Sequence, residues 1–181
     1  MTWLQTRSLP PSGTLDGYID RMAKGDTRSL EQLYRAAAPG VYAYALSILK
    51  NSQDAEDILH EAFLSIYSNA ANYSSQGKPM AWMLTITKNL CFKRLAERQR
   101  YSQTPADEWE GLTAWQNTMT SDDKLVLEAC MKVLSDQERQ IVVLHAVSGF
   151  KHREIAAMLE LPLSTVLSKY NRALKKMKAS L

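Results

Sequence analysis

The sequence predicts an all-α protein made of two small helical domains that are joined by a flexible linker. Apolar residues recur at helical spacing in most segments, and no segment alternates apolar and polar residues as a half-buried strand does. Only seven Gly and six Pro occur among the 181 residues, which disfavours a turn-rich β fold.

The first domain is expected over residues 14–100, after a loose tail at 1–13. Asp26 is placed to cap a helix that begins after Gly25, and Pro79 suits the first turn of another, where its missing N–H costs nothing. The first expected helices cover Leu15–Lys24, Leu30–Ala37 and Val41–Leu49, and Pro39-Gly40 is expected to interrupt the chain between the last two. Two more are expected at 52–70, after Asn51, and at 79–100, after a polar loop at 72–78.

Residues 101–121 are expected to form an acidic linker, and residues 122–181 a second domain. In the second domain, Ser135 and Glu138 have the spacing of a capping box, in which each side chain bonds the other residue's backbone N–H. The expected helices cover 124–134, then 136 to Ser148-Gly149, then 151–160, and finally Ser164 to about Lys178, after a turn at Leu161-Pro162-Leu163.

Basic residues are concentrated on either side of the linker. Residues 88–100 carry five basic side chains and one acidic one, and residues 151–181 carry seven basic and two acidic ones. Residues 101–123 carry five acidic side chains and no Lys or Arg. Two separate basic patches indicate two contacts with one polyanion, although solvated helix faces produce the same pattern.

Neither a secretory signal nor a direct membrane insertion is expected. The N-terminus lacks a basic start followed by an apolar core, and the most apolar stretch, residues 41–49, is too short to span a bilayer. Cys91 and Cys130 lie in separate helical patterns without a CxxC motif, so we expect reduced, semi-buried side chains rather than a redox pair. These features predict a cytoplasmic protein.

Residues 151–178 have the dimensions of a helix-turn-helix: a short apolar helix, a tight turn and a basic helix. Val166, Tyr170 and Leu174 are expected to face the core. The side chains left outward near the start of the last helix, where such motifs enter the major groove, are Thr165, Ser168, Lys169 and Arg172. The alternative is a protein-binding helix hairpin with a solvated outer face.

Three segments resemble the C-terminal domain of RNA polymerase sigma factors: LSDQER at 134–139, GFKHREIA at 149–156 and TVLS at 165–168. The resemblance implies that Ser168, Lys169 and Arg172 contact the minus-thirty-five promoter element. Leu167 departs from the family, which usually has Arg or Lys at this place, so one base or phosphate contact is expected to be missing. Response-regulator DNA-binding domains share much of this motif, and the first domain has to distinguish the two.

The segment DAEDILHEAF at 54–63 resembles the helix by which sigma factors bind the clamp of core RNA polymerase. Its polar residues recur every three or four positions and form a stripe beside the apolar one. An acidic stripe with apolar neighbours suits docking onto a basic coiled coil, because charge steers the encounter and apolar contact adds affinity. The residues of this stripe are Asp54, Asp57, Glu61 and Ser65.

The same helix also imitates fragments of metal sites, which would make the protein a metal-dependent hydrolase. Asp57-x-x-His60 is half of a di-metal motif, but neither of the other two histidines follows an acid at that spacing. His60-Glu61 begins a zinc-protease motif, but Leu64 stands where the second His is required. No metal site is therefore expected.

The segment 77–90 resembles the part of sigma factors that melts promoters. Trp82, Thr85, Asn89 and Lys93 share one helical face, and an aromatic ring, an amide and a cation together can receive an unstacked base. The resemblance implies that Asn89 holds a flipped base of the minus-ten element. A core role for Trp82 and a plain surface role for Asn89 stay open. Phosphate contacts are expected from Lys88, Arg94, Arg98 and Arg100.

In order and spacing, the three motifs together resemble the extracytoplasmic-function group of sigma factors. The resemblance implies recognition of both promoter elements and promoter melting, with no catalytic site and no cofactor. It implies three partners: the clamp and flap of core RNA polymerase, promoter DNA, and an anti-sigma factor. The alternative is a two-domain helix-turn-helix regulator that binds DNA without the polymerase.

Overall fold

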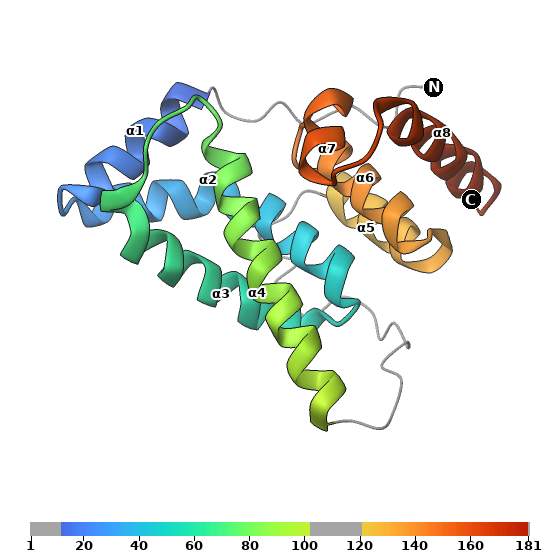
Figure 1. Cartoon of the computed structure of the whole chain (residues 1–181), viewed down its shortest axis with the longest axis horizontal. Helices are drawn as coiled ribbons and strands as arrows, with labels where there is room; N and C mark the ends of the chain where they lie inside the picture. The colour runs from blue at the N-terminus through green and yellow to red at the C-terminus, as the bar shows by residue number, and fades with distance from the viewer. Residues whose placement is uncertain (1–11, 102–120, 181) are drawn as a thin grey trace.

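The computed structural model describes residues 12–101 and 121–180, and all regular structure in these two ranges is helical (Figure 1). The prediction of an all-α fold is confirmed. The expected N-terminal tail and nearly all of the expected linker lie outside the described residues. The elements are α1 (Ser12–Ala23), α2 (Thr27–Leu49), α3 (Ser52–Asn69), the 3-10 turn η1 (Ala70–Asn72), α4 (Pro79–Tyr101), α5 (Ser121–Val133), α6 (Asp136–Ala146), α7 (His152–Met158) and α8 (Leu163–Ala179).

Helix α2 runs without a break from Thr27 to Leu49, so the predicted interruption at Pro39-Gly40 is wrong. Pro39 removes one helical hydrogen bond, but the residues on either side of it are fully buried, and this packing outweighs the local penalty. The predicted cap is confirmed: the Asp26 carboxylate accepts from the Arg28 N–H at 3.0 Å. Lys50 ends the helix in a left-handed conformation with φ of 56°.

Helices α1 to α4 form one group, in which α2 contacts all three of the others (Figure 1). Helix α3 begins where expected, because the Asn51 side chain accepts from the Asp54 N–H at 2.9 Å. The rings of Tyr34 and Phe63 meet at 4.7 Å between α2 and α3. Every residue from Val41 to Leu49 is buried, which a helix achieves only when neighbours cover all its sides.

Helices α5 to α8 form a second group, with α6 at its centre. The Ser135 N–H and hydroxyl both donate to the Glu138 carboxylate, at 3.1 and 2.9 Å, and the Lys176 ammonium donates to the same oxygen at 2.7 Å. The predicted inner face of the last helix needs one correction. Val166 is buried as expected, but the helical turn brings Ala173 inward in place of Leu174, which is half-buried.

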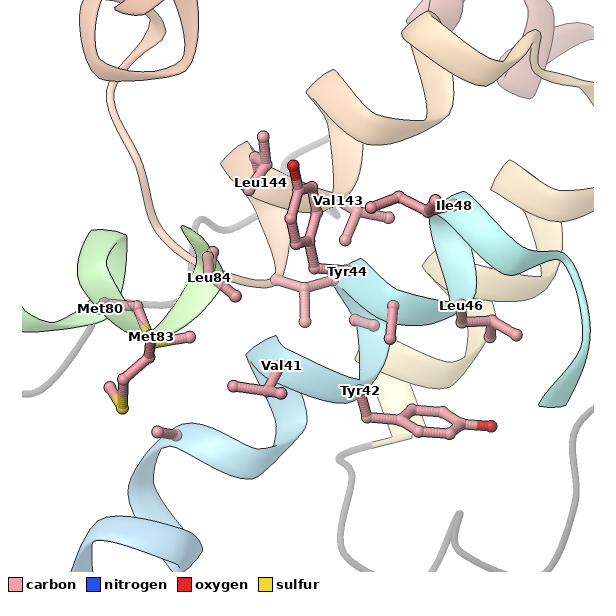
Figure 2. Packing of buried hydrophobic residues seen from close by; sticks show 14 of the residues in the cluster. Val41, Tyr42, Tyr44, Leu46, Ile48, Met80, Met83, Leu84, Val143 and Leu144 are labelled. Atoms are coloured by element: carbon pink, nitrogen blue, oxygen red, sulfur yellow. The ribbon is translucent and has the colours of Figure 1, made fainter. Parts of the chain in front are cut away.

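The two groups pack against each other through α2 and α6, and their buried residues make one continuous apolar cluster. Figure 2 shows Tyr44 of α2 beside Val143 and Leu144 of α6. Cys91 and Cys130 are both buried with free thiols, and burial raises the pKa of each to about 12. Such thiols are poor nucleophiles, and both side chains are more deeply buried than the semi-buried state predicted for them.

Within the two described ranges, no helix has the length and apolar character needed to cross a bilayer.

Candidate polymerase and nucleic-acid interfaces

The four residues of the predicted acidic stripe lie on α3, in very different surroundings. Asp54 is the most buried, with a side chain only 12% exposed, whereas the side chain of Asp57 is 55% exposed. Glu61 and Ser65 are half-buried further along the helix. The stripe therefore presents its charge to solvent through Asp57 and Glu61 rather than through Asp54.

The charge of this stripe is shared with the basic end of α4. Arg94 lies 3.1 Å from the Asp54 carboxylate, 3.5 Å from that of Asp57 and 4.0 Å from that of Glu61. Arg98 lies 2.6 Å from the other oxygen of Asp54. Partial burial by itself would lower the pKa of Arg94, but the carboxylates of Asp54 and Asp57 outweigh it and raise that pKa. Residues predicted to contact polymerase and residues predicted to contact DNA thus form one ion-pair network.

Beside the stripe, α2 and α3 enclose an apolar groove of about 640 Å³. Leu64 projects into solvent at this groove with 70% of its surface exposed, and Tyr67 next to it is also exposed. Exposed apolar side chains that line a groove beside charged residues are typical of a protein-binding surface. The groove is lined by Thr27, Leu30, Glu31, Tyr34, His60, Phe63, Leu64 and Tyr67.

A second hollow, of about 400 Å³, lies between the start of α4 and the loop that precedes it. Gly77 allows the loop to turn, because its φ of 69° is a conformation that other residues rarely adopt. The hollow combines one aromatic wall with amide, hydroxyl and ammonium groups. It is lined by Asn72, Tyr73, Ser74, Gln76, Lys78, Ala81, Trp82 and Thr85.

Trp82 forms the aromatic wall and is half-buried, so it contributes both to the core and to the hollow. Its ring lies 4.5 Å from that of Tyr73, and the Tyr73 hydroxyl donates to the Asp16 carboxylate at 2.6 Å. Burial and this hydrogen bond raise the pKa of Tyr73, so the phenol stays neutral. Tyr73 therefore supports the Trp82 ring, and both rings line the hollow.

The remaining predicted residues of α4 lie along its surface beyond the hollow. Thr85 is exposed at the rim, and its hydroxyl donates to the Ala81 carbonyl. Asn89 and Lys93 follow on the same face, one and two turns further on, and both are exposed. The Lys88 ammonium lies 5.9 Å from the centre of the Phe92 ring, which is 50% exposed. The structure brings Trp82 and Thr85 together in the hollow and leaves Asn89 and Lys93 outside it.

The loop side of this hollow was not predicted from the sequence. Residues 72–78 were expected only as a polar connector, yet they supply five of the eight lining residues, among them Tyr73, Gln76 and Lys78. A single aromatic residue in an otherwise polar loop, next to the helix that carries Trp82, was the available signal.

Helices α7 and α8 are joined by a tight turn. Glu160 takes a left-handed conformation with φ of 54°, and the Leu161 N–H donates to the Ala156 carbonyl at 2.9 Å. This closes α7 and lets α8 begin at Leu163, one residue earlier than expected. Ala156 is buried on α7, which packs against α8.

The four predicted residues of α8 lie on the side away from the core. Ser168 and Arg172 are exposed, and Thr165 and Lys169 are half-buried. The Ser168 hydroxyl donates to the Thr165 carbonyl at 3.0 Å, which fixes its rotamer. Leu167 is also exposed, at 41%, so an apolar side chain stands among these polar ones.

Three rings, those of His145, His152 and Tyr170, pack together where α8 meets α6 and α7. His145 and His152 stack with their ring centres 4.3 Å apart, and Tyr170 meets both edge-on. The Nδ1 atom of His145 bonds the Phe150 carbonyl at 2.8 Å. Burial and the neighbouring His145 lower the pKa of His152, which favours its neutral form. No local pattern in the sequence predicted this cluster.

Family models match both groups of helices. Residues 33–101 match the model of sigma-70 region 2, and residues 124–177 match that of sigma-70 region 4. Among solved structures, the chain is similar to CnrH, determined in complex with the cytosolic domain of CnrY, with a TM-score of 0.61 and 20% identity over 92% of this chain and 96% of that one. It is also similar to the sigma factor RpoE of Bartonella quintana, determined in complex with the anti-sigma factor NepR, with a TM-score of 0.61 and 19% identity over 84% of this chain and 96% of that one. These likenesses show the fold.

Curated relatives match over nearly the full length. The chain is 26% identical to the ECF RNA polymerase sigma factor SigK of Mycobacterium tuberculosis over 179 residues, which cover 93% of this chain and 95% of that protein. It is 27% identical to the ECF RNA polymerase sigma factor EcfG of Rhodopseudomonas palustris over 156 residues, or 86% of each chain. With both regions matched in their expected order, the chain belongs to the extracytoplasmic-function sigma factors of the sigma-70 family.

Proposed function

We propose that the protein binds core RNA polymerase, recognises the minus-ten and minus-thirty-five elements and melts promoter DNA through binding energy alone, without catalysis. The observation that carries this proposal is the hollow at the start of α4, walled by Trp82 and lined by polar side chains. A duplex surface needs no such recess, whereas a base that has left the stack needs an aromatic wall and groups that bond its edge.

The hollow and the exposed face of α4 suit a single strand in complementary ways. One unpaired base enters beside Trp82, where the side chains of Gln76 and Lys78 are within the lining. Asn89, one turn further along α4, forms hydrogen bonds with the edge of another unpaired base. The ammonium groups of Lys88 and Lys93 bind the backbone phosphates. Arg94 and Arg98 act mainly through their ion pairs with α3, which fix the two helices to each other.

The polymerase clamp is proposed to dock on α3. Asp57 and Glu61 supply exposed charge that steers a basic partner, and the apolar groove with Leu64 supplies area that is buried on binding. Asp54 contributes by anchoring Arg94 and Arg98 rather than by direct contact. The flap is proposed to hold the second group of helices while α8 contacts the minus-thirty-five element.

A cytoplasmic location and an inhibitory partner complete the proposal. The related RpoE was solved in complex with an anti-sigma factor, and CnrH with a cytosolic domain of another protein. We propose that this chain is likewise held inactive by an anti-sigma factor that covers its polymerase and DNA surfaces.

Transcription in vitro with the cognate core polymerase and promoter tests the proposal. The protein should give a promoter-dependent transcript, and it should co-purify with core polymerase. A footprint by the protein alone, without a transcript or core binding, would instead identify a regulator that acts without the polymerase.

Replacing Asn89→Ala tests the proposed base contact on α4. The rate of open-complex formation should fall about tenfold, the effect of losing one good base contact, while the affinity of the closed complex changes little. The reactivity of unpaired thymines with potassium permanganate measures the rate of open-complex formation. Gel mobility at low temperature measures the affinity of the closed complex. Equal losses in both would discard this role.

A further inference from the structure

Leu167 is an apolar side chain exposed on a strongly basic helix. It is 41% exposed, whereas Leu163, one turn earlier on α8, is half-buried and packs against the core. Between Leu163 and Ala179 the helix carries five Lys or Arg residues and no acidic one. A helix of this charge is suited to a polyanion, so Leu167 lies within a surface that attracts nucleic acid.

The first turns of α8 carry two parallel rows of side chains, because residues four positions apart lie one above the other on a helix. The apolar row consists of Leu163 and Leu167. The hydroxyl row consists of Ser164 and Ser168, both exposed, and it continues to the exposed Arg172. The two rows are neighbouring ridges of the helix surface. Whatever the hydroxyl row contacts, the apolar row therefore meets as well.

Both rows begin directly after the tight turn that joins α7 to α8 (Figure 1). In helix-turn-helix proteins this end of the second helix enters the major groove, and its side chains contact base edges. The base edges in this groove carry hydrogen-bonding groups and one apolar group, the C5-methyl group of thymine. A leucine side chain can bond neither a phosphate nor a polar base atom, so the methyl group is the one base-edge partner that suits Leu167.

The identity of the opposing base pair decides whether this contact helps or hinders binding. Against thymine, Leu167 and the methyl group both leave water, and the burial of one methyl group raises affinity about fourfold. Against cytosine, the same side chain keeps water from the amino group without replacing its hydrogen bond, which lowers affinity. An apolar residue in this row therefore discriminates between bases.

We propose that Leu167, supported by Leu163, contacts the C5-methyl group of one thymine in the minus-thirty-five element and sets a thymine preference at that base pair. The inference rests on the proposed function. It gives Leu167 a base contact of apolar chemistry in place of the base or phosphate contact that was expected to be missing there.

Selection from a DNA library identifies the base pair. Holoenzyme assembled from the full chain and core polymerase is used to select duplexes that are randomised across the minus-thirty-five element. The wild-type chain should select thymine at one position, and Leu167→Ala should lose this preference while it keeps the others. Leu125→Ala removes an equally large exposed side chain from α5 and should select the wild-type sequence. Circular dichroism checks that both variants keep the helix content of the wild type.

Deoxyuridine then tests the methyl group itself, because it differs from thymidine only in lacking that group. Replacing the selected thymine with deoxyuridine should weaken binding by the wild type and by L125A about fourfold, the effect of one buried methyl group. Binding by L167A should change by less than about 1.5-fold, since no apolar partner is left. Equal losses in the wild type and L167A would overturn the proposal, and so would a wild type that selects no thymine or loses no affinity.

Failure of the proposed function gives a different result. A holoenzyme that gives no promoter-dependent transcript, while the chain binds DNA without polymerase, would refute the proposed function. The deoxyuridine comparison on duplexes selected by the chain alone would then still support or overturn the contact of Leu167. If neither the holoenzyme nor the chain alone selects any sequence, both proposals are overturned.

Discussion

The surfaces proposed to contact DNA are built differently in the two groups of helices. On α3 and α4 the functional side chains are held by one another: Asp54 fixes Arg94 and Arg98, and Tyr73 supports Trp82 around a preformed hollow. On α8 the corresponding side chains are exposed or half-buried, and the helix is held by the packing of Tyr170 against His145 and His152. A strand that has to be captured unpaired needs a shaped recess, whereas a duplex groove needs only a helix that fits it.

The largest expected effect is on the stability of the first group. Asp54→Asn leaves Arg94 and Arg98 partly buried without their shared carboxylate, and the free energy of unfolding should fall by about 3 kcal/mol. Asp57→Asn, at an exposed member of the same network, should cost under about 1 kcal/mol. Urea unfolding followed by circular dichroism measures both. Equal losses in the free energy of unfolding would show that the ion pairs of Asp54 stabilise the fold no more than an ordinary surface pair does.

The next largest effect is expected at the hollow, and it tests the role of Trp82 in open-complex formation. Trp82→Ala removes the stacking wall, and base stacking is worth about 1–3 kcal/mol, so open-complex formation should slow by roughly 10- to 100-fold. Trp82→Phe keeps a smaller wall and should recover most of the rate. Because Trp82 also packs on Tyr73, thermal unfolding must be measured for both. A rate loss no greater than the fraction unfolded would assign Trp82 to the core alone.

On α8, individual contacts should matter less and depend on salt. Lys169→Ala should weaken binding to all promoters by a similar few-fold factor and reduce the slope of log affinity against log salt by about 1, as expected for one phosphate contact. Lys175→Ala, two turns further along and exposed, is the matched control. A change in promoter preference instead of a uniform loss would make Lys169 a base-reading residue.

The smallest effect concerns the ring stack beneath α8. The pKa of His152 is lowered from its ordinary value of 6.5, so the neutral form stabilises the fold above pH 6.5. As the pH falls below that value, the unfolded chain takes up a proton more readily than the folded one, and stability is lost. The thermal midpoint should therefore drop between pH 7 and pH 5.5, and His152→Gln should flatten this drop.

The sequence predicted the helices better than it predicted their environments. Apolar periodicity and caps such as Asp26 and Ser135 are local features, so the helix order and most boundaries followed from them. The break at Pro39-Gly40 was wrong because burial on all sides of α2, a tertiary effect, kept the helix intact. The acidic stripe was foreseen, but its pairing with Arg94 was not, since residues 40 positions apart give no local signal of contact.

The uncharged stretch from Val41 to Leu49 has a consequence for the lifetime of the chain in a cell. A change that loosened α6 from this stretch would expose a large apolar surface to water, and such surfaces promote aggregation and cleavage by proteases. The packing of α6 on α2 protects the chain from both.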